Sequence, residues 1–203
     1  MTSEAKKGGL PSWAKILIGA TVVVLVGVVA LVVGVGLFFG NMVKQAQDPA
    51  AIARVARSIA TFSEPLPAGY KFSMGIDIAG IKTVTVEHQP EKQMLIVMSF
   101  PKKEKADPQT LVNELYERGV NTPQASAKFQ EVKTRGTEKV AGQQMPYIIG
   151  TMTDRVNNRF EGLVGCIVSP TRNETIFVYG IQPPGSPYNF DVTRGFLQTI
   201  KSL

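Results

Sequence analysis

The sequence predicts an α+β protein: a single transmembrane helix near the N-terminus, followed by one α/β/α sandwich domain with a mostly antiparallel sheet. Three observations lead to this prediction. Residues 16–39 form an uncharged apolar run, apolar residues alternate with the period of strands from residue 70 onward, and three segments have the period of amphipathic helices. Because several strand-like segments are apolar on both faces, helices are expected to cover both faces of the sheet.

The apolar run is long enough to span a membrane. Residues 16–39 carry no charged side chain, and Thr21 is the only hydroxyl residue among them. At about 1.5 Å per residue the run spans roughly 36 Å, against a hydrocarbon core of about 30 Å. A cleaved signal peptide has a shorter apolar core, and Lys44 stands where cleavage would need a small residue. We therefore expect a retained signal anchor with a tail at 1–15, a transmembrane helix at 16–40, a short linker at 41–47 and a folded domain at 48–203.

Charge on the two sides of the run gives an orientation. The basic residues before it are Lys6, Lys7 and Lys15, and those after it are Lys44, Arg54 and Arg57. Together with the terminal amine, the short tail holds a slight excess, which favours a cytoplasmic N-terminus. The prediction is a single-pass membrane protein whose C-terminal domain is extracytoplasmic, on the periplasmic side.

Small residues recur on one face of the predicted transmembrane helix. Ala20, Gly27, Ala30 and Gly34 are the small residues of one face, on which Ala20, Val23, Gly27, Ala30, Gly34 and Leu37 follow one another at alternating spacings of three and four. Small side chains let a second helix approach closely, which is the usual basis of helix association in lipid. These four residues are therefore candidates for packing against a membrane protein partner or a second copy. The alternative is that Gly and Ala are simply common in transmembrane helices.

Three helices are expected in the domain. Asp48-Pro49 and Asp107-Pro108 each combine an N-cap with a proline at the first helical position. The apolar face of the first helix is expected to include Phe62, and the second helix is expected to end at Gly119. A last helix is expected to open at Ser186-Pro187, with the following residues on one face: Val192, Phe196, Ile200 and Leu203.

Seven segments have the pattern of strands. They are residues 71–78, 82–88, 93–100, 130–140, 144–153, 160–169 and 174–181. The segment at 130–140 is the most polar and is expected near an edge of the sheet. Turn residues separate the segments, including Ala79-Gly80 and Ala141-Gly142. The loops at 65–70 and 182–188 carry apolar residues that could contact a partner.

Catalytic chemistry finds little support in the sequence. His88 is the only histidine and is expected at a strand end on the surface, whereas Cys166 is the only cysteine and is expected to be a buried, inert thiol. One histidine and one cysteine do not provide the usual spacing of a metal site. No catalytic, cofactor-binding or metal-ligating residue is assigned, and no cofactor is expected. The acids Asp77, Glu87, Asp154 and Glu161 are scattered, so a carboxylate pair among them stays an open alternative.

The net charge of +6 comes from basic residues that are interleaved with acids. No basic stripe with interleaved aromatic residues is found, so nucleic-acid binding is not expected.

The order of elements resembles the PsbP-like fold of small extracytoplasmic domains. The resemblance covers residues 65–203 and rests on the turn at 140–142 and on the ending Phe196-Leu-Gln-Thr-Ile-Lys-Ser202. It implies the fold and a general role, because bacterial members are often anchored binding or assembly factors without a catalytic site. No functional residue set is carried over.

The leading functional hypothesis is a non-catalytic accessory subunit or assembly and stability factor of a membrane protein complex. The alternative is a membrane-anchored extracytoplasmic module that binds a ligand. A pocket of a few hundred cubic ångströms with convergent polar groups would favour the alternative.

Overall fold

The computed structural model describes residues 46–101, 107–121, 126–154 and 157–203. Residues 46–203 form one compact unit, which is described here by itself. The predicted transmembrane helix at 16–40 and its packing residues Ala20, Gly27, Ala30 and Gly34 lie outside the described residues. Within the described ranges no helix has both the length and the apolar character needed to cross a bilayer.

The domain is built on an eight-stranded sheet in which every pair of neighbours is antiparallel. In spatial order the strands are β2 (Tyr70–Ile78), β3 (Ile81–His88), β4 (Gln93–Pro101), β9 (Glu174–Gln182), β8 (Arg159–Val168), β7 (Gln143–Asp154), β6 (Ser126–Val140) and β5 (Val120–Asn121). A second, two-stranded sheet pairs β1 (Thr61–Phe62) with β10 (Ile200–Ser202). The predicted α+β class with a mostly antiparallel sheet is confirmed.

Three helices accompany the sheet: α2 (Pro49–Ile59), α3 (Pro108–Arg118) and α4 (Phe190–Leu197). Asp48 caps α2 by accepting a hydrogen bond from the Ala51 amide, and Asp107 caps α3 in the same way from Thr110. Both Asp-Pro starts predicted from the sequence are therefore confirmed, because the cap satisfies a free amide and proline has none to satisfy.

Two helix boundaries differ from the prediction. Phe62 lies in β1, after α2 has ended in the extended residue Ala60. The last helix does not open at Ser186-Pro187; it begins at Phe190 and ends at Leu197. The amide and hydroxyl of Thr199 both donate to the Phe196 carbonyl, which closes the helix before β10. Helical spacing in the sequence predicted Phe62 and Ile200 on the faces of helices. Both side chains are buried, but they lie in strands β1 and β10.

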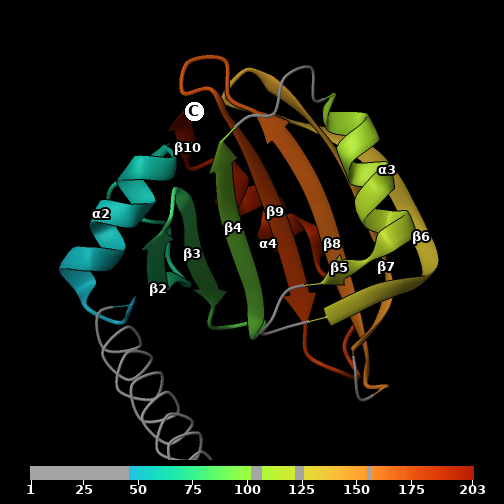
Figure 1. Ribbon diagram of the computed structural model, residues 1–203. Helices are drawn as coiled ribbons and strands as arrows, with labels where there is room; N and C mark the ends of the chain where they lie inside the picture. The colour runs from blue at the N-terminus through green and yellow to red at the C-terminus, as the bar shows by residue number, and fades with distance from the viewer. Residues whose placement is uncertain (1–45, 102–106, 122–125, 155–156) are drawn as a thin grey trace, which may run out of the picture. The chain divides into compact units, whose positions relative to one another are not determined.

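Helices pack on both faces of the sheet. One hydrophobic cluster joins the sheet to α2 and α4, and a second cluster joins the other face to α3. In Figure 1, α4 is seen behind the central strands and α3 lies over the strands at the right. The two faces are not equally buried, because β4 alternates between fully buried residues toward α2 and α4 and partly exposed residues toward the α3 side.

Tyr188 packs directly on Gly180 of β9. A Cβ built on Gly180 would lie 1.7 Å from the Tyr188 hydroxyl oxygen, so only glycine leaves room for the ring. The hydroxyl also forms a hydrogen bond with Thr193 of α4. This contact brings the segment before α4 down onto the sheet.

The uneven burial of β4 predicts unequal costs for neighbouring truncations. Leu95→Ala is expected to lower the free energy of unfolding by about 2–5 kcal/mol, because Leu95 is fully buried. Ile96→Ala, on the partly exposed face, is expected to cost less than half as much. Urea unfolding of the full chain in mild detergent measures both values. Equal costs would show that the two faces of β4 are buried alike in solution.

Candidate functional site

Cys166 lies near the C-terminal end of β8 (Arg159–Val168) and is fully buried in the cluster that includes Val112 of α3. Burial, with a smaller contribution from the negative charge of Asp107, raises the pKa of the thiol to about 12. A thiol with this pKa is almost entirely protonated at neutral pH, so it is a poor nucleophile. The predicted burial of Cys166 is confirmed.

His88 is less exposed than predicted. Its ring packs against Tyr70, with the two ring centres 4.7 Å apart, and lies under the backbone of Gly69. The Tyr70 hydroxyl donates to the Val192 carbonyl of α4, so the aromatic pair belongs to the contact between β2, β3 and α4. The predicted position at a strand end is confirmed, but the side chain is only partly exposed, because the turn at residue 69 folds over the strand end.

A row of polar side chains crosses the sheet at this end. His88 lies opposite Gln93, and the register of β4 with β9 brings Gln182 next in the row. Both glutamines are buried, and Gln93 donates to Thr193 over 3.0 Å. Within the described residues His88 Nδ1 and the two glutamine Oε1 atoms have no protein hydrogen-bond partner. The residues paired with His88 across the strands are Tyr70 and Gln93, and neither is a serine, cysteine or threonine, so the row does not form a nucleophile–base arrangement.

Glu161 joins three elements. Its carboxylate pairs with Lys133 of β6 and accepts a hydrogen bond from the Tyr188 amide over 2.9 Å. Partial burial favours the neutral form, but the hydrogen bonds and the Lys133 charge outweigh it, so the pKa of Glu161 is lowered. Both carboxylate oxygens are engaged, and this residue is structural.

The other three candidate acids do not assemble into a site. Asp154 accepts two hydrogen bonds from Asn158 in the turn after β7. Asp77 and Glu87 are exposed and, from the strand registers, lie on opposite faces of the sheet. Over the described part of the chain no group of three or more His, Cys, Asp or Glu residues could hold a metal ion.

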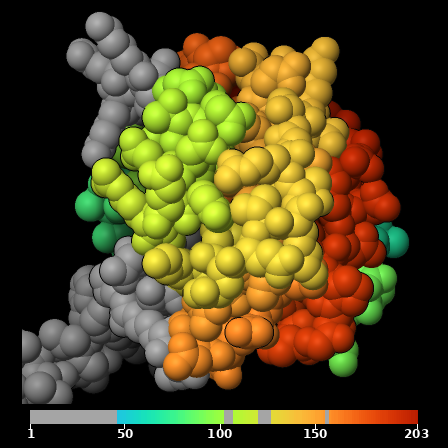
Figure 2. All heavy atoms as spheres, turned by 90° about the vertical axis from the view of Figure 1, so that its right-hand side faces the viewer, coloured from blue at the N-terminus to red at the C-terminus, as the bar shows by residue number. Residues whose placement is uncertain are grey.

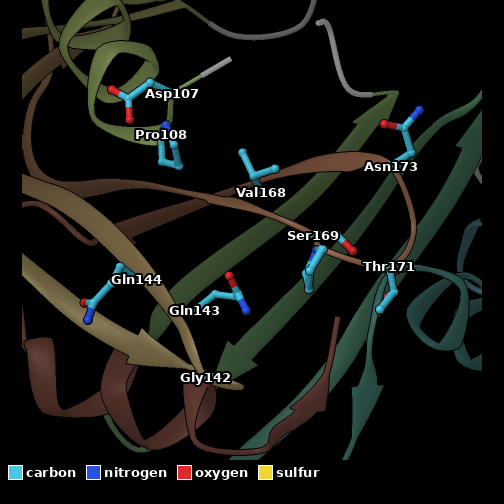
Figure 3. Close-up of a pocket in the computed structure, with 10 residues that line it drawn as sticks. Asp107, Pro108, Gly142, Gln143, Gln144, Val168, Ser169, Thr171 and Asn173 are labelled. Carbon is cyan, nitrogen blue, oxygen red and sulfur yellow. The ribbon is translucent and has the colours of Figure 1, made fainter. Parts of the chain in front are cut away.

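A depression of about 730 Å³ lies where the start of α3 meets the turns at 142–144 and 168–173 (Figure 3). Its volume falls in the range of ligand sites. Its polar groups, however, serve the protein itself. Asp107 caps α3, Ser169 accepts from the Arg172 amide, and Thr171 donates to the Leu203 carbonyl.

Figure 3 shows that the side chains around the depression do not converge on one point. Gln143 extends toward its middle, whereas the carboxylate of Asp107 points away from it. Most of the lining residues are exposed. The depression therefore meets the size criterion for a ligand site but not the criterion of convergent polar groups.

The more informative surface is the face of β2, β3 and β4 on the α3 side of the sheet. We call its two central cross-strand rows the open face; they consist of Met74, Ile76, Thr83, Thr85, Ile96 and Met98. All six are partly exposed, while their neighbours along β3 and β4, such as Val84 and Leu95, have no exposed surface. None of the six is charged.

Next to the open face, the β2–β3 hairpin ends in exposed hydrophobic residues. Ile78 and Ile81 are 47% and 41% exposed and are the most exposed large hydrophobic residues in the described part of the chain. Between them Ala79 and Gly80 both have positive φ angles, 52° and 82°, as a two-residue type I′ turn requires. The tight turn therefore fixes both isoleucines at the tip of the sheet.

Sequence reasoning did not identify this surface. Partner contacts were expected in the loops at 65–70 and 182–188, and the apolar character of 93–100 was interpreted as burial on both faces. A usable signal was present, because isoleucine stands immediately on each side of Ala79-Gly80. Large apolar residues directly beside a tight turn have few neighbours to cover them.

Comparison with known proteins adds a fold-level likeness. No family model and no curated protein matches the sequence. Among solved structures, the chain is similar to the solution structure of cyanobacterial PsbP (CyanoP) from Synechocystis, at 12% sequence identity and a TM-score of 0.40. The match covers 66% of this chain and 79% of that chain. The PsbP-like resemblance expected from the sequence thus appears again as a likeness to this structure, and no residue role or activity is taken from it.

The environment of Cys166 predicts slow modification of the folded protein. A pKa of about 12 in place of 9.0 lowers the thiolate fraction near pH 8 roughly a thousandfold, before steric protection is counted. An aromatic disulfide reagent should therefore label the native full chain at least that much more slowly than the urea-unfolded chain. Rapid labelling of the native chain would instead indicate an accessible, ionised thiol.

Proposed function

We propose that this protein is a non-catalytic, single-pass membrane protein that serves as an accessory subunit or assembly factor of a membrane protein complex. In this proposal residues 16–40 span the membrane with the N-terminus in the cytoplasm, and the domain described above binds a partner protein on the extracytoplasmic side. The apolar run and the basic tail support the anchor and its orientation.

The observation that carries the binding role is the open face with its hairpin tip. Side chains of β2, β3 and β4 present a continuous uncharged surface, and Ile78 and Ile81 extend it to the edge of the sheet. Exposed contiguous patches of largely apolar side chains are often interaction sites. Ligand binding in the depression beside α3 is less well supported, because its polar groups are already used within the fold.

A double substitution at the hairpin tip tests this role. Ile78→Lys with Ile81→Lys is expected to abolish co-purification with partner proteins in mild detergent, because each lysine would be buried without a counter-charge at the interface. The fold should persist, since both side chains are exposed. Circular dichroism and the melting temperature verify that point.

The matched control places the same charges on another strand. Thr134→Lys with Thr137→Lys changes two exposed residues of β6 and is expected to leave the set of companions unchanged. If both double variants retain all companions, the domain does not recruit a partner through this surface.

Residues of the predicted transmembrane helix are tested separately. Gly27→Ile, Ala30→Ile and Gly34→Ile together should preserve membrane insertion but remove helix partners, because the larger side chains prevent close approach. Val24→Ile, Leu25→Ile and Val32→Ile, off that face, form the control set. Co-purification is the readout. Retention of every companion by the first set would mean that the helix only tethers the protein.

A further inference from the structure

We infer that the open face binds one amphipathic helix of the partner protein, which lies beside α3 and completes the helical layer on that side of the sheet. The inference rests on the proposed function and names the chemistry of its partner. On the other side of the sheet, α2 and α4 both contribute to the buried cluster. On this side, among the described elements, α3 is the helix that contributes residues to the buried cluster.

The open face forms the floor of the binding surface. Met74, Thr85 and Ile96 lie side by side in one row across β2, β3 and β4, and Ile76, Thr83 and Met98 form the next row. Ile96 and Met98 also pack against the cluster under α3, so the floor continues into that cluster. Methionine is flexible and polarisable, and it adapts well to an incoming apolar side chain.

One side of α3 forms a wall next to this floor. Successive helical residues are about 100° apart, so with Val112 pointing into the sheet, Leu111 and Leu115 lie on one side and Asn113 and Tyr116 on the other. Asn113 and Tyr116 both contact Arg135 of β6, by a 3.0 Å hydrogen bond and by a ring contact of 5.0 Å.

Since α3 and β6 lie side by side (Figure 2), Leu111 and Leu115 face the opposite direction, toward β9 and β4. Both leucines are only partly buried. A second helix laid beside α3 would cover them together with the floor.

The dimensions of the floor fit one helix. Three strands about 4.8 Å apart make a surface roughly 14 Å wide, and a helix with its side chains is about 10–12 Å across. With the hairpin tip, the rows of the floor extend over residues 74–78 of β2, roughly 17 Å along the strands, which is the length of about 11 helical residues. The footprint is then roughly 240 Å², about a third of the about 800 Å² per partner that a standard stable interface buries. A single helix of a partner that is held by other contacts fits this area better than an independent dimer.

Charge argues against a second copy as the occupant. If two open faces met, the outer surface of α3 from each copy would rest on the floor of the other. That outer surface carries Glu114, Glu117 and Arg118, all exposed. Arg118 can offset one carboxylate and the floor offers no charged side chain to the other, so at least one carboxylate per copy would be buried unpaired. A partner surface that complements the floor is therefore uncharged and apolar along one side. An amphipathic helix with apolar residues at i, i+3 or i+4, and i+7 has such a surface.

Site-specific photocrosslinking in the native membrane tests the inference on the full chain. A benzophenone amino acid is placed at Thr83 in the centre of the floor, at Leu111 on the wall, or at Thr134 on exposed β6 as the control. Crosslinked peptides are sequenced to find the modified positions in the partner. Unchanged melting temperatures of the three variants verify the fold.

The expected result is that Thr83 and Leu111 label one segment of another protein at positions separated by three, four or seven residues, whereas Thr134 does not label it. Adding Met98→Lys should lower the Thr83 yield about tenfold, and Thr137→Lys should leave it unchanged. Labelled positions at every second residue would indicate a strand. Peptides from another copy of this chain would indicate self-association, and lipid adducts alone would indicate a membrane surface. Each of these three results would overturn the inference.

Failure of the inference can be told apart from failure of the proposed function. If Thr83 and Leu111 label nothing while Ile78→Lys with Ile81→Lys still removes the companions, the partner binds at the hairpin tip alone. The proposed accessory role would then be supported, whereas the inferred partner helix on the open face would be contradicted. If the tip variant also retains every companion, the binding role of the domain falls together with the inference.

Discussion

Leu95 and Val97 of β4 have no exposed surface, and three residues opposite them are buried in the same cluster: Val84 and Val86 on β3 and Val178 on β9. The positions of α2 and α4, the polar row at Gln93 and the open face all depend on this register. Because strand side chains alternate between faces, a shift of one residue would bring the partly exposed residues inward and the buried ones outward. The burial of this face of β4 against α2 and α4 therefore also determines which side chains are exposed on the opposite face.

Most of the fold could be predicted from local signals. The strands from residue 70 onward have alternating or continuous apolar patterns bounded by turn residues, and each appears within a few residues of its expected limits. Asp48-Pro49 and Asp107-Pro108 mark helix starts by chemistry that acts over three residues. The buried thiol of Cys166 follows in the same way from its apolar neighbours on β8.

The rest depends on contacts between distant segments. Ile200 pairs with Phe62 in a small sheet, which the period of the preceding helix could not reveal. The exposure of Ile96 and Met98 depends on α3 covering only the β6–β8 half of its face, and no pattern within 93–100 carries that information. The packing of His88 depends likewise on Tyr70 and the turn at Gly69. The sequence pattern shows how apolar the two faces of a strand are, but the packing of distant segments determines which face is buried.

The contact between Tyr188 and Gly180 has a consequence for how this sequence can diverge. The aromatic ring occupies the volume that any side chain at position 180 would need, and its hydroxyl is held by Thr193. Neither position can therefore change independently: a larger residue at 180 is compatible only with a much smaller one at 188, which would also remove the hydrogen bond between Tyr188 and Thr193. Across descendants of this chain, the two positions should be inherited as a pair or replaced together.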